Sequence, residues 1–320
     1  MRSVSLVWLV LCSTAFFTTA KAQVPTEHLV LTSLQATYSI TTALARGTQV
    51  RVMNIPSQGA VMDSQAFALT RVDDAIFKQA EAVVTINKLW REDPLYPVAR
   101  ARNIQVINID ASFPWGATES GVSVMRKPIN NVPWEVQQDN DAVGLSRYMW
   151  LSSANAIRMA ELVAADLVRL SPKDAQQIQT NLAAFTVSTR QFTAEYGARF
   201  ALLPDPRVFS LADEFVYLLS DLGIYVDGWF IKQDVNWSEA DLAALTKYLQ
   251  SHDIRVVVHK WMPDDKIKAA ITKANAALVV LDAGDPGRVI NSAIDPAGYE
   301  VLMRENMEGL LRAFGSSAVQ

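Results

Sequence analysis

The residue types that most often perform catalysis or bind metals are scarce in this sequence. It contains one cysteine, Cys12, and three histidines that are not sequence neighbours, His28, His252 and His259. No G-x-S-x-G, P-loop or G-x-G-x-x-G segment is present. We therefore expect that the protein is not an enzyme, and a binding function becomes the leading hypothesis.

Acidic residues at the expected ends of strands are the sharpest candidates for a ligand site. Asp282 follows the apolar run 277–281, and ligands of open α/β sheets bind beyond the carboxyl ends of strands. A turn-capping role would explain Asp282 equally well. Asp213 and Glu214 precede an expected helix, where the helix dipole alone favours acids. For all three residues, both interpretations stay open.

Strands and helices alternate along the chain. Continuous apolar runs such as 82–86 are typical of buried parallel strands. We expect strands at 29–33, 50–55, 82–86, 105–109, 207–210, 255–258 and 277–282, and helices at 38–45, 73–80, 94–102, 155–170, 213–222, 239–251, 264–274 and 299–314. The alternation predicts an α/β fold with parallel sheets covered by helices.

One predicted helix is much longer than the others. Ser171 is a suitable N-cap, Pro172 fits the first helical position, and the prolines of 203–206 stop the helix. We therefore predict an N-terminal lobe at 23–171, a linking spine helix at 172–201 and a C-terminal lobe at 202–320, with a ligand cleft between the lobes. Segment 111–147 interrupts the alternation and is predicted to be a functional or mobile loop.

Residues 1–22 have the layout of a cleaved secretory signal peptide. Arg2 precedes the apolar run 4–17, and a small-x-small cleavage site follows at 20–22; a retained anchor is the alternative. Export would leave no cysteine, which excludes disulfides and thiolate metal ligands. A formal charge of −4 over 320 residues argues against a nucleic-acid partner. We expect an exported, monomeric protein.

Several segments, in their order and spacing, match one known family. They are Val30-Leu31-Thr32-Ser33 with Tyr38, the strand 80–87, Trp150-Leu151-Ser152 with Asn155-Ala156, the start of the spine at 171–175 with Asn181 and Phe185, Phe215-Val216-Tyr217-Leu218 with Gly223, and Leu281-Asp282 with Tyr299, Leu302, Met303 and Asn306. Across essentially the whole chain after residue 22, the sequence resembles the periplasmic solute-binding proteins of zinc, manganese and iron ABC transporters.

The resemblance implies a metal site with four ligands, commonly three His and an Asp, or two His, a Glu and an Asp. Asp282 matches the Asp of this set. Tyr148 stands where the family has a His, and Gln65, with Asp63 close by, falls near another His. Most of the expected imidazole ligands are therefore replaced in this chain.

The third family ligand falls at Ala212, where the adjacent Asp213 or Glu214 could substitute. An oxygen-rich set of this kind suits Mn²⁺ or Fe³⁺ better than Zn²⁺, although Tyr148 would have to ionise from a pKa near ~10. Alternatively, the cleft holds a metal chelate or another small solute gripped by Trp90, Trp115 or Trp150.

The resemblance implies a carrier that captures a metal ion or metal complex and presents it to an inner-membrane ABC permease. The metal is then the transported ligand, and its identity stays open. The missing histidines support an alternative function, a periplasmic partner or scaffold protein of a metal-handling system that holds no tight ligand of its own.

Overall fold

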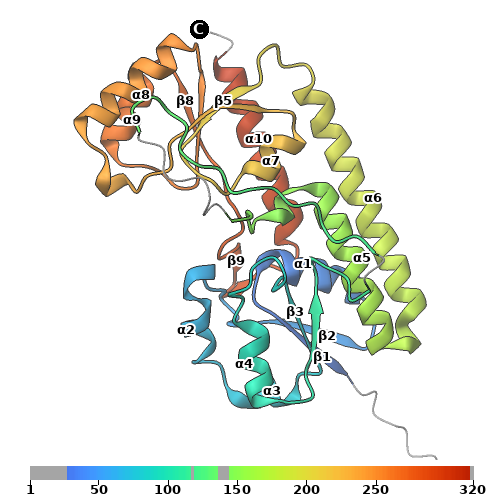
Figure 1. Ribbon diagram of the computed structural model, residues 1–320. Helices are drawn as coiled ribbons and strands as arrows, with labels where there is room; N and C mark the ends of the chain where they lie inside the picture. The colour runs from blue at the N-terminus through green and yellow to red at the C-terminus, as the bar shows by residue number, and fades with distance from the viewer. Residues whose placement is uncertain (1–26, 117–118, 136–143, 318–320) are drawn as a thin grey trace, which may run out of the picture.

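Two parallel sheets, each covered by helices, form two lobes of an α/β fold (Figure 1). The computed structural model describes residues 27–116, 119–135 and 144–317, so the predicted signal peptide lies outside the described residues. The predicted fold class, with its parallel sheets and a long helix, is confirmed.

The N-terminal sheet has the order β2-β1-β3-β4, and the C-terminal sheet has the corresponding order β6-β5-β7-β8. The strands are β1 (His28–Thr32), β2 (Val50–Asn54), β3 (Ala82–Thr85), β4 (Ile107–Asp110), β5 (Arg207–Ser210), β6 (Tyr225–Trp229), β7 (Val256–His259) and β8 (Ala277–Val280). All neighbouring strands in both sheets run parallel. The carboxyl ends of each sheet therefore share one edge, where ligands of such sheets bind.

The helices follow the predicted alternation closely. They are α1 (Gln35–Ala45), α2 (Gln65–Leu69), α3 (Asp74–Gln79), α4 (Leu95–Arg102), α5 (Ser153–Leu170), α6 (Ala175–Phe200), α7 (Val216–Asp221), α8 (Glu239–Ser251), α9 (Asp265–Lys273) and α10 (Gly298–Ser317). Asp213 and Glu214 precede α7 without capping it, because Phe215 is its N-cap residue. They still lie next to the N-terminus of α7, so the helix-dipole explanation and the ligand role both stay open.

The spine is α6, which has 26 residues and follows a short 3-10 turn at Pro172–Asp174. At 1.5 Å per residue it is about 39 Å long. The Asn181 side chain donates to Leu44 O at 2.8 Å in the N-terminal lobe. The Tyr196 hydroxyl donates to Glu308 Oε1 at 3.1 Å on α10, in the C-terminal lobe. The helix thus contacts both lobes along one side of the molecule (Figure 1).

One apolar core continues from lobe to lobe through α5. It includes Val30 of β1, Met159 of α5 and Val258 of β7, all 0% exposed. Trp150, 1% exposed, lies in the same cluster, and full burial of a large apolar side chain contributes roughly 2–3 kcal/mol. A shared core restricts how far the lobes can separate.

A hairpin from the C-terminal third of the chain packs on the N-terminal lobe. It consists of β9 (Val289–Ile290) and β10 (Ala293–Ile294). Ile294 N donates to Ser57 O at 2.7 Å, and Arg288 N donates to Gln35 Oε1 at 2.9 Å. Segment 202–320 therefore contributes contacts to both lobes, and the predicted boundaries at 171 and 201 stay a prediction.

The predicted long loop, 111–147, leads from the N-terminal lobe to β5 and β6 of the C-terminal lobe. Asn131 exchanges two hydrogen bonds with the backbone of Trp229 in β6, at 3.1 and 2.6 Å. Trp134 stacks on Phe209 of β5 with ring centroids 6.4 Å apart. The described parts of 111–147 thus leave the N-terminal lobe and pack along the C-terminal lobe.

Candidate functional site

A polar pocket of about 370 Å³ lies where the two lobes meet. Its described lining consists of Asp63, Leu89, Trp90, Glu92, Lys127, Leu145, Ser146, Arg147, Tyr148, Asp213, Glu214 and Lys260. The turn after β3 supplies Trp90, the end of the long loop supplies Ser146, and the turns after β5 and β7 supply Glu214 and Lys260. The pocket therefore lies beyond the carboxyl ends of strands from both sheets, as the fold predicts.

Each basic side chain that lines the pocket forms an ion pair with a carboxylate that also lines the pocket. The pairs are Lys127 with Asp213 at 2.7 Å, Arg147 with Asp63 at 2.9 Å, and Lys260 with Glu214. Asp213 is 8% exposed and Glu214 is 3% exposed. Buried carboxylates of this kind require a cation or several donors nearby, and here lysine supplies the positive charge that a bound metal supplies in a metal site.

Two buried polar atoms of the pocket lack a hydrogen-bond partner among the described residues. They are Glu214 Oε2 and Ser146 Oγ. Leaving a buried acceptor unpaired costs about 1–3 kcal/mol, and both atoms have almost no exposed surface.

Lys260 is positioned by its buried neighbour His259. The His259 ring is 1% exposed, and its Nδ1 accepts a hydrogen bond from Lys260 N at 2.8 Å. Its Nε2 lies 3.5 Å from Asp234 Oδ1. Burial lowers the pKa of His259 below its usual value despite the nearby Asp234 carboxylate. His259 thus has a structural role at the end of β7.

Tyr148 lies in the pocket as a neutral phenol. Burial, followed by the negative charges of Glu214 and Asp285, raises the pKa of Tyr148 far above its ordinary value of 10.0. Its ring packs edge-on against Trp150 with centroids 5.4 Å apart. This environment opposes the ionisation that a phenolate metal ligand would need.

Asp282 does not line this pocket, and its place in the wall of the cleft stays a prediction. The residue is exposed, and its Oδ1 accepts a hydrogen bond from Gly284 N at 2.8 Å. Its backbone N–H donates to Asn306 Oδ1, and its backbone carbonyl accepts from Asn306 Nδ2. Asp282 therefore caps the turn after β8, the alternative that the sequence left open.

Asp285, in the same turn, contacts the segment just before Asp63. Its Oδ1 accepts from Met62 N at 2.8 Å. Burial is the main cause that raises the pKa of Asp285 to about 6, and Arg147 and Met62 N oppose this rise. The fields of Asp63 and Glu214 also raise the pKa of Asp285, which places the residue within electrostatic range of the pocket.

Gln65 lies beside the pocket without lining it. It is 0% exposed at the start of α2, and its Nε2 donates to Ser33 O at 2.9 Å. The amide thus ties α2 to the end of β1, and its role as a metal ligand stays a prediction that this geometry does not favour. Asp63, its predicted neighbour, does line the pocket.

The three predicted cleft tryptophans have separate locations. Trp90, 5% exposed, lines the pocket. Trp115, 67% exposed, borders a shallow hollow with Lys88 instead. Trp150 is a core residue whose Nε1 donates to Ala283 O at 2.8 Å. Of the three, only Trp90 is placed to contact a ligand in this pocket.

The sequence analysis missed the basic residues of the pocket. Lys260 follows β7 as Asp282 follows β8, so the same argument from strand ends applies to it. Arg147 is adjacent to Tyr148 in the sequence. Lys127 carries no local signal, because it lies in a loop whose path depends on packing against β6 and α7.

No group of three or more His, Cys, Asp or Glu side chains that could hold a metal ion occurs within the described part of the chain. The acidic residues around the pocket are separated by the lysine and arginine side chains that pair with them.

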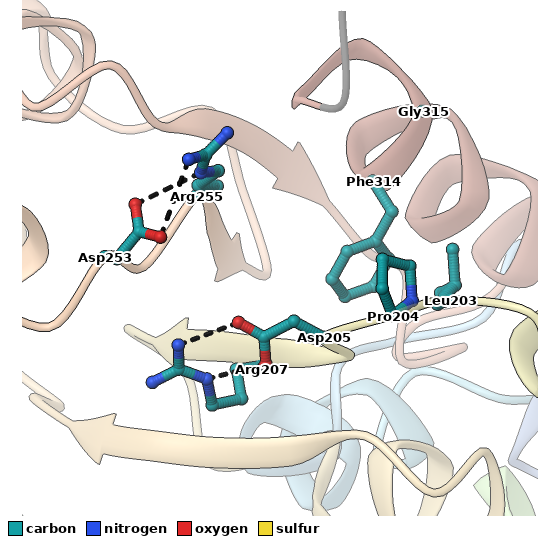
Figure 2. Close-up of a pocket in the computed structure, with 8 residues that line it drawn as sticks. All are labelled: Leu203, Pro204, Asp205, Arg207, Asp253, Arg255, Phe314 and Gly315. Carbon is teal, nitrogen blue, oxygen red and sulfur yellow. Dashed lines mark hydrogen bonds and ion pairs between the residues drawn. The ribbon is translucent and has the colours of Figure 1, made fainter. Parts of the chain in front are cut away.

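A second cavity, of about 310 Å³, lies at the opposite end of β5 and β7 (Figure 2). Leu203, Pro204 and Phe314 form an apolar side, and Arg207 is held by Asp205 through two hydrogen bonds of 2.7 Å. The strands begin there, whereas ligands of such sheets bind where strands end. The pocket between the lobes is therefore the better candidate.

Fold and site together define the class of two-lobed solute-binding proteins with a helical spine. The family described as "zinc-uptake complex component A, periplasmic" (ZnuA) matches residues 30–313. The chain belongs to this periplasmic family, whose members are carriers and not enzymes. None of the helices in the described ranges is both long and apolar enough to cross a membrane.

Solved structures show the same fold at low sequence identity. A mutant of FpvC from Pseudomonas aeruginosa is 19% identical with a TM-score of 0.70, covering 90% of this chain and 99% of that one. A ZnuA crystal structure is 19% identical with a TM-score of 0.65, at 90% and 99% coverage. A periplasmic metal-binding protein from Candidatus Liberibacter asiaticus is 18% identical with a TM-score of 0.65, at 90% and 100% coverage. No curated protein sequence matches the chain significantly.

Proposed function

We propose that this protein is the periplasmic substrate-binding component of a metal-uptake ABC transporter, which carries its metal as a small complex in the pocket between the lobes. Membership of the zinc-uptake family supports metal as the cargo. Solved structures of FpvC hold Ni²⁺ and Mn²⁺. An inner-membrane permease is the expected acceptor of the cargo.

The single observation that carries the choice of a complex is the pairing of pocket carboxylates with lysine and arginine. A bare Zn²⁺ or Mn²⁺ ion would have to displace Lys260 from Glu214 and Lys127 from Asp213, and within the described residues these carboxylates belong to no group of three or more that could hold a metal ion. A pocket of about 370 Å³ instead has the size of a small-molecule site. The cargo can then bring its own metal ligands.

Isothermal titration calorimetry of the exported chain tests this proposal. Zn²⁺, Mn²⁺, Fe³⁺ and Ni²⁺ salts would be titrated first, followed by the same metals as complexes with small amino-carboxylate and hydroxy-carboxylate chelators. We expect saturable heat from at least one complex and little from the free ions. Tight binding of a free ion would contradict the proposal.

The absence of a described ligand cluster favours one other function, a periplasmic partner protein without a tight ligand. The same titrations separate the two. An absence of saturable heat with every ion and every complex would support the partner protein and overturn the carrier.

A further inference from the structure

A shallow hollow of about 620 Å³ lies in the N-terminal lobe, beyond the carboxyl ends of β3 and β4. The residues of its lining that carry charge or a large aromatic surface are Lys88, Arg91, Asp110 and Trp115. The turn after β3 supplies the first two, and the segment after β4 supplies Trp115. Parallel sheets bind ligands at this edge, and the carrier function leaves this hollow without a role.

The buried carboxylate of Asp110 joins the two sides of the hollow. Asp110 is 4% exposed, and its Oδ2 accepts a hydrogen bond from Lys88 N at 2.9 Å. Its Oδ1 accepts from Ser112 N at 2.8 Å and from Phe113 N at 3.1 Å. The two turns are therefore held together by backbone donors, and a partner that binds here meets a prearranged surface.

The basic side chains of the hollow carry charge that no described carboxylate neutralises. Lys88 and Arg91 are exposed, and neither forms an ion pair within the described ranges. The Lys88 ammonium donates to Pro114 O at 3.3 Å, and Glu92, next to Arg91, lines the pocket between the lobes instead. The hollow thus differs from that pocket, where each cation has a carboxylate partner, and its positive potential attracts acidic groups.

An exposed tryptophan lies beside these cations. Trp115 is 67% exposed, and Lys88 Nζ lies 5.9 Å from its ring centroid. Tryptophan and arginine are the residue types that most often dominate the binding energy of protein interfaces. A small molecule is usually bound with about 70–90% of its surface buried, which a shallow hollow beside so exposed a ring does not provide. A protein partner therefore fits this surface better.

An anionic membrane surface is the alternative occupant of a basic surface. Recognition of anionic lipids usually relies on clusters of about four to eight Lys or Arg. The lining of the hollow contains two, and the whole chain has a formal charge of −4. An acidic protein segment is the better match.

The turn after β3 also borders the pocket between the lobes. Leu89 and Trp90 line that pocket, whereas Lys88 and Arg91 line the hollow. The turn is compact, because Leu89 N and Trp90 N both donate to Ile86 O, at 3.0 and 2.8 Å. A partner in the hollow therefore lies against the segment that forms one wall of the cargo site.

We propose that this hollow is the docking surface for an acidic segment of a protein partner. Carboxylates of the partner pair with Lys88 and Arg91, and an apolar side chain packs on Trp115. The partner is the permease that receives the cargo; this part of the assignment rests on the proposed function. Docking on the turn after β3 places the permease next to the pocket that it empties.

Membrane vesicles from the cells that produce the protein test this proposal. The exported chain, labelled with a fluorophore at its N-terminus, would be titrated with right-side-out inner-membrane vesicles. We expect saturable binding that weakens as the salt concentration rises, because exposed charges are screened. Protease-treated vesicles and protein-free vesicles of the same lipids should bind little.

Two variants and two matched controls locate the binding surface. Arg91→Glu and Trp115→Ala should each weaken vesicle binding about tenfold, the loss expected for a central charged or aromatic interface residue. Lys247→Glu and Tyr225→Ala remove an exposed cation and an exposed aromatic side chain on the C-terminal lobe, and they should leave binding unchanged. All four positions are exposed, so each variant should fold, and melting curves check this.

The outcomes separate docking from carriage. The docking surface would be overturned by equal vesicle binding of the original chain and both variants, by an absence of saturable binding, or by equal binding to protein-free vesicles; none of these results touches cargo binding. Loss of cargo binding by Arg91→Glu or Trp115→Ala in the calorimetric titrations would assign the hollow to the cargo site and also overturn the proposal. If no cargo binds but vesicle binding stays sensitive to both variants, the docking surface stands and the carrier function fails.

Discussion

At the scale of single residues, Lys260 and Glu214 distinguish this pocket from a site for a free metal ion. The glutamate lies two residues after Ala212, where the family resemblance placed a ligand, and its charge is neutralised by a lysine after the neighbouring strand. At Asp213, the Lys127 ammonium likewise supplies the positive charge that a metal ion would supply in a metal site. Charge pairing, more than ligand type, therefore decides what this pocket can bind.

Lys260→Met should destabilise the folded protein, because it leaves Glu214 buried without a counter-charge. Loss of one partner of a buried pair costs about 3–5 kcal/mol; since the Lys260 side chain is 33% exposed, solvent screening reduces this to roughly 1–3 kcal/mol. Urea denaturation measures the change. Lys266→Met is the matched control, because the Lys266–Glu239 pair is exposed; an equal effect in both variants would contradict the assigned role of Lys260.

Asp285 should make stability depend on pH. Its pKa is about 6 in the folded protein and near 3.8 ordinarily, so the folded state retains a proton that the unfolded chain releases. The free energy of unfolding therefore falls as the pH rises from about 4 to about 6. Asp285→Asn, which keeps an acceptor for Met62 N, should be more stable than the original chain at pH 7.5 by about 1–3 kcal/mol, and the gain should shrink at pH 4.5. Urea titrations at the two pH values would contradict this account if the gain were the same at both.

At the scale of elements, the spine helix holds the pocket by joining both lobes. Ala184 lies on the exposed face of α6 near its middle. Ala184→Pro should cost about 3 kcal/mol or more, because it removes a helical hydrogen bond and clashes with the preceding turn. Ala184→Gly, the control, should cost about 1 kcal/mol. Thermal and urea unfolding measure both, and equal costs would argue against a continuous rod.

Most of the elements were predictable from the sequence, because buried parallel strands produce continuous apolar runs. The run Val83–Val84 in β3 and the run Val256–Val257–Val258 in β7 are examples. Strand β6 was missed because Asp227 and Gly228 interrupt its apolar pattern. Gly228 is required there, since a Cβ atom would lie 2.6 Å from the Phe209 ring, a contact that sequence periodicity does not reveal.

The site was predictable only in part. Position after a strand selected Glu214 and Asp213, which line the pocket, and also Asp282, which caps its own turn. The difference depends on the direction in which each turn leaves its strand. That direction is set by contacts between distant segments, such as Asp285 with Met62 and Asn306 with Asp282.

At the scale of the whole molecule, the shared core and the β9–β10 hairpin should limit movement between the lobes. Cysteines introduced as Lys78→Cys on α3 and Lys247→Cys on α8 would carry spin labels, and the chain after the predicted signal peptide has no other cysteine. Electron–electron distance measurements should show a change of no more than a few ångströms when a metal complex binds. A large closure would contradict the role of α6 as a rigid spine.

The most direct measurement for the central claim is anomalous X-ray diffraction from crystals of the protein loaded with a Ni²⁺ amino-carboxylate complex. The account predicts one strong anomalous peak between the lobes, in the pocket bordered by Trp90, Ser146 and Glu214, with the chelator between the metal and these side chains. A peak at Asp282, a peak in the cavity beside Arg207, or a metal bound directly by Glu214 after displacement of Lys260 would contradict it.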